Sequence, residues 1–362
     1  MSIIIFLAVL SVLVFVHELG HFLVAKATGM RVDEFAIGFP PRLVSKTIGE
    51  TKYSINLLPL GGFVKIYGEN PAEVADEGTD GFLQKPKLSR FAVLSAGVLG
   101  NFLFAWLTLS ILFMVGIAAP ASDSEIAAGS STATVVSVLA GSPAEQAGLQ
   151  TGDSIVGIHV PDTAVSTEHI SSEYVITTIQ KHSDSLLQIE VLRDGTPLSF
   201  EVMPAEGIIA NGRAIGVSFA DIVSRQYSFS KAIVAGYTTS ISIIKNIVSS
   251  MVVFFGDVFT GADGTLAQVA GPVGIAGMVG EASSAGFSQL LMLMAIISLD
   301  LAVLNLIPFP ALDGGQIVFV LWETVTGKKI KHNIIGIANT VGFVFLIGLM
   351  IVITVSDVIK LF

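Results

Sequence analysis

Two histidines and a glutamate interrupt the first apolar segment of this chain. In the stretch FVHELGHFLVA they are His17, Glu18 and His21, and they form the pattern H-E-x-x-H. On a helix, residues four apart share one face, so both imidazoles can bind a zinc ion about 2.0–2.1 Å away. The intervening glutamate then lies beside the metal and can act as general base toward a bound water. The pattern predicts a catalytic zinc site.

The alternative is a fortuitous match in which both histidines are satisfied core residues. Ser2–Val16 carries no charge, and Phe22–Ala25 resumes the apolar run. Ionisable side chains cost free energy inside a bilayer, and those found there usually serve a function. The apolar surroundings therefore favour the zinc site.

A catalytic zinc needs a third protein ligand and an open coordination position. The chain has no cysteine, which excludes thiolate ligands and disulfides. In LDLAVLNLIPFPALDGG, residues 299–315, an irregular proline-bearing segment follows an apolar run. Such backbone is tolerated at membrane depth only inside protein or beside a wet cavity. We therefore predict Asp313 as the third ligand and Asn305 as a donor toward the developing oxyanion. The other histidines lie outside the apolar runs (His159, His169, His182 and His332).

The composition indicates a polytopic membrane protein. Of 362 residues, 52% are hydrophobic and only 13% charged, and the mean hydropathy is +0.77. Soluble domains carry about 25% charged residues. The first apolar run lacks the basic segment and cleavage site of a signal peptide. A net charge of −10 argues against nucleic acid as a partner.

Residues 127–205 are predicted to form a separate α+β domain. The stretch GSPAEQAGLQTGDSIVGI resembles part of a bacterial-type PDZ domain. A glycine-rich carboxylate-binding loop before the first strand is not evident, so a generic small β-rich domain is the alternative.

Residues 228–259 are apolar enough for a further span, but Lys245 would lie at its centre. A lysine there costs about 2.5–3.5 kcal/mol on insertion scales, so an amphipathic helix at the interface is favoured. Four spans also place H-E-x-x-H and Asp313 on the same side of the membrane, whereas a fifth would separate them.

The pairing of H-E-x-x-H with a second motif resembles the site-2 protease family of intramembrane zinc metalloproteases, in its RseP-like branch with one PDZ domain. The second motif, N-x-x-P-x-P-x-L-D-G, is complete at Asn305–Gly314. Three further stretches are similar to family signatures: LPLGGFVKIYGE (58–69) to a membrane-entering β-hairpin, AGVLGN (96–101) to a second-helix motif, and GPVGI (271–275) to a loop before the third span. The family usually has proline where Val98 stands, and Asp300 replaces an expected asparagine. Either departure could lower activity.

The resemblance implies that His17, His21 and Asp313 bind one zinc ion per chain and that Glu18 is the catalytic glutamate. It also implies cleavage of transmembrane segments of single-pass proteins, such as anti-sigma factors or remnant signal peptides, by Glu18-assisted attack of zinc-bound water. The hairpin edge at Gly61, Gly62, Phe63 and Val64 is expected to hold the unwound substrate by strand addition. For these glycines, simple turn chemistry is the alternative.

The predicted fold is thus a polytopic α-helical membrane protein with four transmembrane helices, a membrane-associated β-hairpin and an inserted PDZ-like α+β domain. The predicted spans are residues 1–27, 91–120, 284–306 and 333–357. Between them are the hairpin loop 28–90, the PDZ-like domain 127–205, the amphipathic helix and GPVGI loop 206–283, and the second motif with a basic loop 307–332.

Lysines and arginines predict the orientation. Both basic loops, Met30–Arg90 and the one with Lys328, Lys329 and Lys331, should be cytoplasmic. Both termini and the PDZ-like domain are then extracytoplasmic, with the active site toward the cytoplasmic side of a bacterial inner membrane. The competing functions are a catalytically inactive PDZ scaffold and an ion-coupled transporter. The intact H-E-x-x-H set disfavours the first, and the lack of internal repeats disfavours the second.

Overall fold

The computed structural model describes residues 2–69, 80–121, 123–160, 170–193, 195–209, 212–260, 270–328 and 330–360. His169 and Lys329 lie outside these ranges. The chain divides into two compact units. Unit 1 comprises Met1–Leu112 and Phe229–Phe362, and unit 2 comprises Phe113–Ser228.

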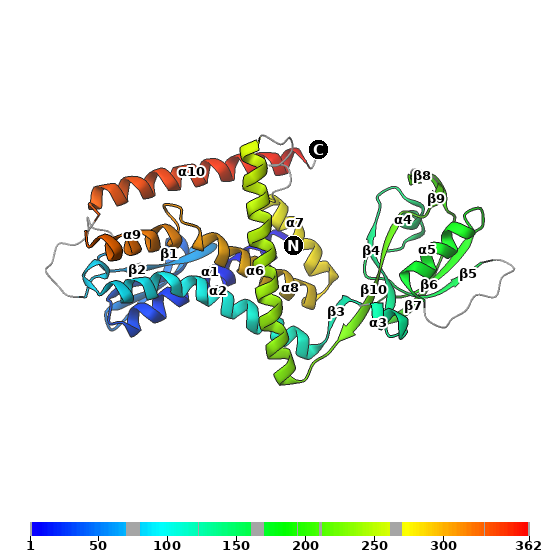
Figure 1. The fold of residues 1–362 in the computed structure, drawn as a ribbon, viewed down its shortest axis with the longest axis horizontal. Coiled ribbons are helices and arrows are strands. Elements are labelled where there is room, and N and C mark those ends of the chain that lie inside the picture. Colours follow the sequence, from blue (N-terminus) through cyan, green and yellow to red (C-terminus); the bar gives the residue numbers. More distant parts are fainter. Residues whose placement is uncertain are drawn as a thin grey trace. The chain divides into compact units, whose positions relative to one another are not determined.

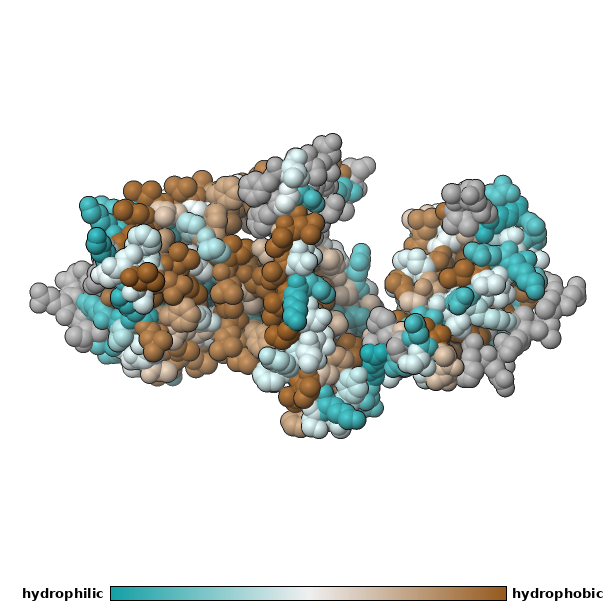
Figure 2. Space-filling view, viewed as in Figure 1, coloured by the Kyte–Doolittle hydropathy of each residue, from teal (hydrophilic) through white to brown (hydrophobic). Residues whose placement is uncertain are grey.

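Unit 1 is built from helices and one sheet (Figure 1). Its helices are α1 (Ser2–Ala27), α2 (Lys87–Val115, whose last turn enters unit 2), α6 (Phe229–Thr260), α7 (Pro272–Ala285), α8 (Phe287–Leu306), α9 (Asp313–Thr326) and α10 (His332–Ile359). Among the described residues, five helices are long and apolar enough to cross a membrane, namely α1, α2, α6, α8 and α10. Apolar side chains cover much of the visible surface of this unit, as expected for a polytopic membrane protein (Figure 2).

Helix α6 differs from the other four in direction and composition. It runs crosswise to α2 and α10 (Figure 1). Its mean hydropathy of 1.2 is the lowest of the five, against 2.1 to 2.5 for the rest. Lys245 lies near its middle and is exposed.

The sheet of unit 1 consists of β1 (Val32–Ile48) and β2 (Thr51–Ile66), which pair antiparallel. Phe35 pairs with both Tyr53 and Val64, so the start of β1 lies between two segments of β2. A bend in β1 at Gly38, whose φ is +79°, brings its second half back against the start of β2. The segment 62–66 consequently forms an outer edge of the sheet.

The sheet packs against α1 within its apolar stretch. The Ser11 hydroxyl donates to the Pro59 carbonyl at 2.7 Å. A Cβ added at Gly61 would approach the Val14 side chain to 3.0 Å. Several large apolar side chains of the sheet are exposed, including Phe39, Leu43, Val44 and Leu57. The hairpin therefore lies beside a helix of spanning length and presents an apolar surface.

Unit 2 contains a six-stranded sheet with the strand order β3-β10-β4-β5-β6-β7. Its strands are β3 (Ile117–Pro120), β4 (Thr132–Val138), β5 (Ser154–His159), β6 (Leu187–Arg193), β7 (Thr196–Val202) and β10 (Val217–Arg225), and a small hairpin joins β8 (Ala205–Ile209) to β9 (Gly212–Ala214). Helices α3 (Asp123–Ala127), α4 (Pro143–Ala147) and α5 (Ser172–Lys181) accompany them. Ile155, Leu187 and Ile189 are among its fully buried core residues.

The elements differ in extent from the predicted segments. Helix α2 begins at Lys87 and ends at Val115, ahead of the strand β3, whereas the predicted span was 91–120. Strands β9 and β10, and β8 after its first residue Ala205, lie in the segment 206–283, which was expected to hold only an amphipathic helix and a loop. The sheet-rich unit is consequently longer than the predicted domain 127–205.

Candidate metal and catalytic site

Three potential metal ligands converge inside unit 1. His17 and His21 lie on one face of α1, and Asp313 is the first residue of α9. The two Nε2 atoms are 3.1 Å apart, and they lie 3.1 and 3.3 Å from Asp313 Oδ2. Among the described residues this is the group of His, Asp and Glu side chains that could hold a metal ion. The three ligands predicted from sequence are therefore adjacent in space.

The ligand atoms suit zinc. Two ligands about 2.0–2.1 Å from a tetrahedral zinc ion are about 3.3–3.4 Å apart, close to the distances found here. Asp313 Oδ2 is buried and makes no hydrogen bond with another described residue. A buried carboxylate oxygen without a partner is costly, and a metal ion between the three atoms removes that cost. Nitrogen and carboxylate ligands without thiolate are typical of catalytic zinc sites.

Small residues allow α2 to approach α1 beside the site. A Cβ at Gly20 would lie 2.2 Å from the Ala96 carbonyl oxygen, and one at Gly100 would lie 2.9 Å from that of Val16. Gly97 covers the imidazoles directly, since a Cβ there would lie 2.4 Å from His21 Nε2. Any larger residue at position 97 would occupy the space next to the ligand nitrogens.

A compact loop after α8 places Asp313. Gly314 and Gly315 leave no room for a side chain, because a Cβ would approach the carbonyl oxygens of Ile307 and Phe309 to 2.2 and 2.3 Å. Ala311 adopts a positive φ of 74°, and its N–H donates to Asn339 Oδ1 on α10 at 3.3 Å. The proline-rich segment thus turns tightly and delivers the carboxylate toward α1.

Glu18 is held by the edge of the β-sheet. The backbone N–H of Val64 donates to Glu18 Oε2 at 2.9 Å. Because the amide points away from β1, it belongs to the open edge formed by 62–66. The predicted general base and the predicted substrate-binding edge are therefore joined by a hydrogen bond.

The non-ligating nitrogens of both histidines also have neighbours. His21 Nδ1 lies 2.8 Å from the Val93 carbonyl oxygen. His17 Nδ1 lies 3.4 Å from the side-chain nitrogen of Asn101. Both neighbours come from α2.

Several groups around the site have no predicted role. Asn101 and Gly97 belong to the AGVLGN stretch, which resembles a family signature without indicating what these residues contact. Glu69 follows β2, and the charges of His21, Asp313 and Glu18 act on its carboxyl. Its side chain is exposed to solvent. No sequence pattern indicates that the backbone N–H of Val64 donates to Glu18.

The remaining candidates are not members of the ligand cluster. Asn305 is near the end of α8, in the same segment as Asp313, and its side chain makes no hydrogen bond with another described residue. His159 and His182 lie in unit 2, and His332 begins α10. Asp300 lies within α8, one residue after the fully buried Leu299.

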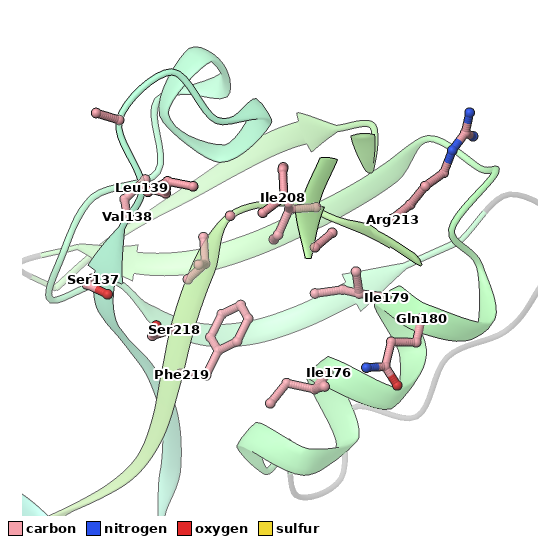
Figure 3. Close-up of a pocket in the computed structure, with 15 residues that line it drawn as sticks. Ser137, Val138, Leu139, Ile176, Ile179, Gln180, Ile208, Arg213, Ser218 and Phe219 are labelled. Carbon is pink, nitrogen blue, oxygen red and sulfur yellow. The ribbon is translucent and has the colours of Figure 1, made fainter. Parts of the chain in front are cut away.

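Unit 2 has a groove of its own, of about 620 Å³ (Figure 3). It is lined on one side by Ile176 and Ile179 of α5 and on the other by Phe219 of β10. Residues 213–217, from the end of β9 to the start of β10, also line the groove. Gly216, between the two strands, has φ +80°.

A metal site with an H-E-x-x-H helix, set among helices of membrane-spanning length, defines a membrane-bound metallopeptidase as the class of protein. The chain matches peptidase family M50 over residues 5–349. It is 34% identical to a putative zinc metalloprotease of Clostridium perfringens, with 99% of each chain covered. It is 29% identical to the zinc metalloprotease RasP of Bacillus licheniformis, covering 100% of this chain and 99% of the relative. The regulator of sigma-W protease RasP of Bacillus subtilis is 27% identical, with the same coverage.

The chain therefore belongs to peptidase family M50, the site-2 protease family, and is a zinc metalloprotease. The fold class predicted from sequence is confirmed to this extent: a membrane protein with several apolar helices and a sheet-rich region.

Proposed function

We propose that this protein cleaves transmembrane segments of single-pass membrane proteins inside the bilayer. The observation that carries the proposal is the position of the ligand cluster. His17 and His21 lie within the apolar helix Ile3–Ala27, and Asp313, at the start of α9, reaches them from the loop that follows the apolar helix Phe287–Leu306. A peptide bond must enter the membrane-embedded part of the protein to reach such a site.

The residues around the cluster can carry out hydrolysis. A zinc ion held by His17, His21 and Asp313 would supply the Lewis acid that polarises the scissile carbonyl. Glu18 accepts a proton from the attacking water and returns it to the leaving amine. Asn305 donates a hydrogen bond to the carbonyl oxygen as negative charge builds there.

The edge segment 62–66 is the proposed substrate-binding strand. A substrate helix must unwind before a carbonyl can reach the site, and an unwound chain needs backbone partners in an apolar environment. An open sheet edge provides such partners by strand addition. Gly61 directly precedes this edge and Gly62 begins it, and a Cβ at Gly62 would lie 2.5 Å from the Ala36 carbonyl oxygen. Phe63 and Val64 continue it, and Val64 touches Glu18.

We propose four transmembrane spans, with α6 at the outer interface. If α6 also crossed the membrane, Asp313 would emerge on the opposite side from His17 and His21. The three ligand atoms lie within 4.8 Å of one another, which favours an even number of crossings between them. The crosswise direction of α6 and its exposed Lys245 support the same topology.

We propose that unit 2 is a PDZ-like domain on the extracytoplasmic side. Its groove between α5 and β10, which is also lined by residues 213–217, supports binding of an extended peptide along β10, including a newly formed C-terminus. The domain would also restrict access by substrates with bulky outer portions. Since a relative is named for sigma-W regulation, anti-sigma factors are candidate substrates.

The test is cleavage of a single-pass model substrate in proteoliposomes together with the zinc content of the enzyme. Glu18→Gln should keep stoichiometric zinc and lose cleavage by about 10²-fold or more. Glu190→Gln, an exposed carboxylate of unit 2, is the matched control and should keep both. Normal cleavage by Glu18→Gln would remove the proposed general base and, with it, this mechanism.

A further inference from the structure

Asn101 lies on α2 beside the metal site and contacts both α1 and α8. It is completely buried on α2. Its backbone carbonyl accepts a 2.9 Å hydrogen bond from the Ser298 hydroxyl of α8. Its side chain faces His17 on α1. Because Gly97 and Gly100 let α1 and α2 approach closely, the Asn101 side chain has little freedom to move away.

The geometry of the ligands fixes where the imidazole hydrogens must be. Both Nε2 atoms face Asp313 and each other, so these are the nitrogens available to a metal. A neutral imidazole that binds metal through Nε2 carries its hydrogen on Nδ1. For His21 this hydrogen has an acceptor, the Val93 carbonyl oxygen at 2.8 Å.

The Nδ1 hydrogen of His17 faces a second hydrogen-bond donor instead of an acceptor. His17 Nδ1 is 3.4 Å from Asn101 Nδ2, which is also a donor. At the same time, Asn101 Oδ1 is buried and has no hydrogen-bond partner among the described residues. This arrangement is unfavourable for two reasons: two donor groups face each other, and a buried acceptor oxygen has no donor.

A half-turn of the carboxamide resolves both problems. The oxygen and nitrogen of an amide are nearly equal in size, so the exchange needs no new space. We propose that Asn101 Oδ1 accepts the hydrogen bond from His17 Nδ1–H and that Asn101 is a positioning residue of the metal site. It selects the tautomer and ring orientation in which His17 presents Nε2 to the metal. Outer groups of this kind typically change metal affinity or activity 10–100-fold when removed.

This proposal concerns residues around the zinc site and rests on the proposed ligand role of His17. It can be tested by zinc affinity alone, in competition with a chromophoric chelator, using the full-length protein in detergent. Asn101→Leu keeps the approximate size but removes the acceptor, and it should weaken zinc binding about 10–100-fold. Asn101→Asp keeps an acceptor oxygen and should remain close to the wild-type affinity.

The pair of variants separates positioning from packing. If Asn101 served only to fill space, leucine would be tolerated, and a buried carboxylate would be the damaging change. Leucine at wild-type affinity, or equal losses in both variants, would overturn the proposal. Asn101→Ala provides a second variant without an acceptor if the leucine variant does not fold.

A matched control comes from the β-sheet. Asn56 is also buried and also has an unpartnered side-chain oxygen, but its amide donates to the Gly38 carbonyl and contacts no histidine. Asn56→Leu and Asn56→Asp should leave zinc affinity unchanged.

The absorption spectrum of the Co(II)-substituted protein gives an independent readout. It should stay unchanged in Asn101→Asp and shift in Asn101→Leu, because only the latter frees the His17 ring. Equal zinc affinity in the wild-type and His17→Ala proteins would instead contradict the ligand assignment itself.

Discussion

At the scale of single residues, the motif supplies ligand atoms, and their neighbours determine whether those atoms can act together. Asp313 Oδ2 illustrates this dependence, because it has no hydrogen-bond partner of its own in the described structure. A metal ion bound between it and the two imidazole nitrogens, which lie 3.1 and 3.3 Å away, would supply the missing partner. The carboxylate is therefore expected to be as important for metal retention as either histidine.

Replacing the proposed ligands tests this expectation. His17→Ala, His21→Ala and Asp313→Ala should each retain less than about a tenth of the zinc after dialysis against a weak chelator, since a three-ligand site is reduced to two. Metal analysis of the purified proteins measures the effect. His159→Ala in unit 2 is the control and should remain fully loaded. An Asp313→Ala protein with full zinc would require a different third ligand.

The hydrogen bond from Val64 to Glu18 gives a second expectation. Val64→Pro removes the backbone donor, so Glu18 should be less well oriented and kcat should fall about tenfold or more, as expected for a lost hydrogen bond to a charged group. Zinc content should not change. Val64→Ile keeps the N–H and controls for the side chain. Steady-state cleavage with unchanged kcat in the proline variant would show that this contact does not orient the general base.

At the scale of elements, the close contact between α1 and α2 determines the shape of the site. Gly97 lies so near the imidazoles that a Cβ would overlap the space of His21 Nε2. The contact also places Val93 next to the His21 ring and Asn101 next to the His17 ring. A small change in the spacing of these helices should therefore affect metal binding first.

Gly97→Ala should accordingly lose most of its zinc and lower the melting temperature of the purified protein. Overpacking of this kind typically costs about 1–3 kcal/mol of stability. Gly348→Ala on α10 is a matched control, because nothing lies within 4 Å of its Cβ position. Retention of full zinc and of the melting temperature by Gly97→Ala would mean that α1 and α2 can separate at little cost.

How much of these elements could be predicted depends on how local their signals are. The apolar runs and the H-E-x-x-H spacing are properties of short segments, and the helix carrying His17 and His21 followed from them. The folding back of β1 between two parts of β2 depends on pairings such as Phe35 with Val64, which no short pattern encodes. Strand β10 was missed for the same reason, since its partners β3 and β4 lie about a hundred residues earlier. The Val64 donor is a backbone group and could be recognised only in three dimensions.

At the scale of the whole molecule, the proposed topology can be tested by cysteine labelling, because the chain contains no cysteine. Single cysteines at Lys85 and Lys328 should react with an impermeant maleimide only after the cytoplasmic side is opened. Cysteines at Lys181 of unit 2 and Lys245 of α6 should react from outside. Outside labelling at Lys328 would imply a fifth crossing and would be incompatible with four spans.

The role of unit 2 can be tested by removing it at its base. Phe113 and Tyr227 lie side by side there, with ring centroids 5.5 Å apart and a 2.8 Å hydrogen bond from the Tyr227 N–H to the Phe113 carbonyl. The chain therefore enters and leaves the unit at neighbouring points, and a short glycine-serine linker can replace Ile117–Arg225. This deletion removes β3 and β10 together, so no unpaired strand is left behind.

If unit 2 screens substrates, the deletion variant should cleave a pre-trimmed single-pass substrate at nearly the wild-type rate. It should also accept a substrate that still carries a bulky outer domain, which the intact enzyme should reject. Cleavage of both substrates in detergent and in proteoliposomes measures the difference, with zinc content as the control for folding. Loss of cleavage of the short substrate with zinc retained would instead make unit 2 a required part of substrate delivery. No change with either substrate would identify it as a passive spacer, because a filter must alter the ratio between the two rates.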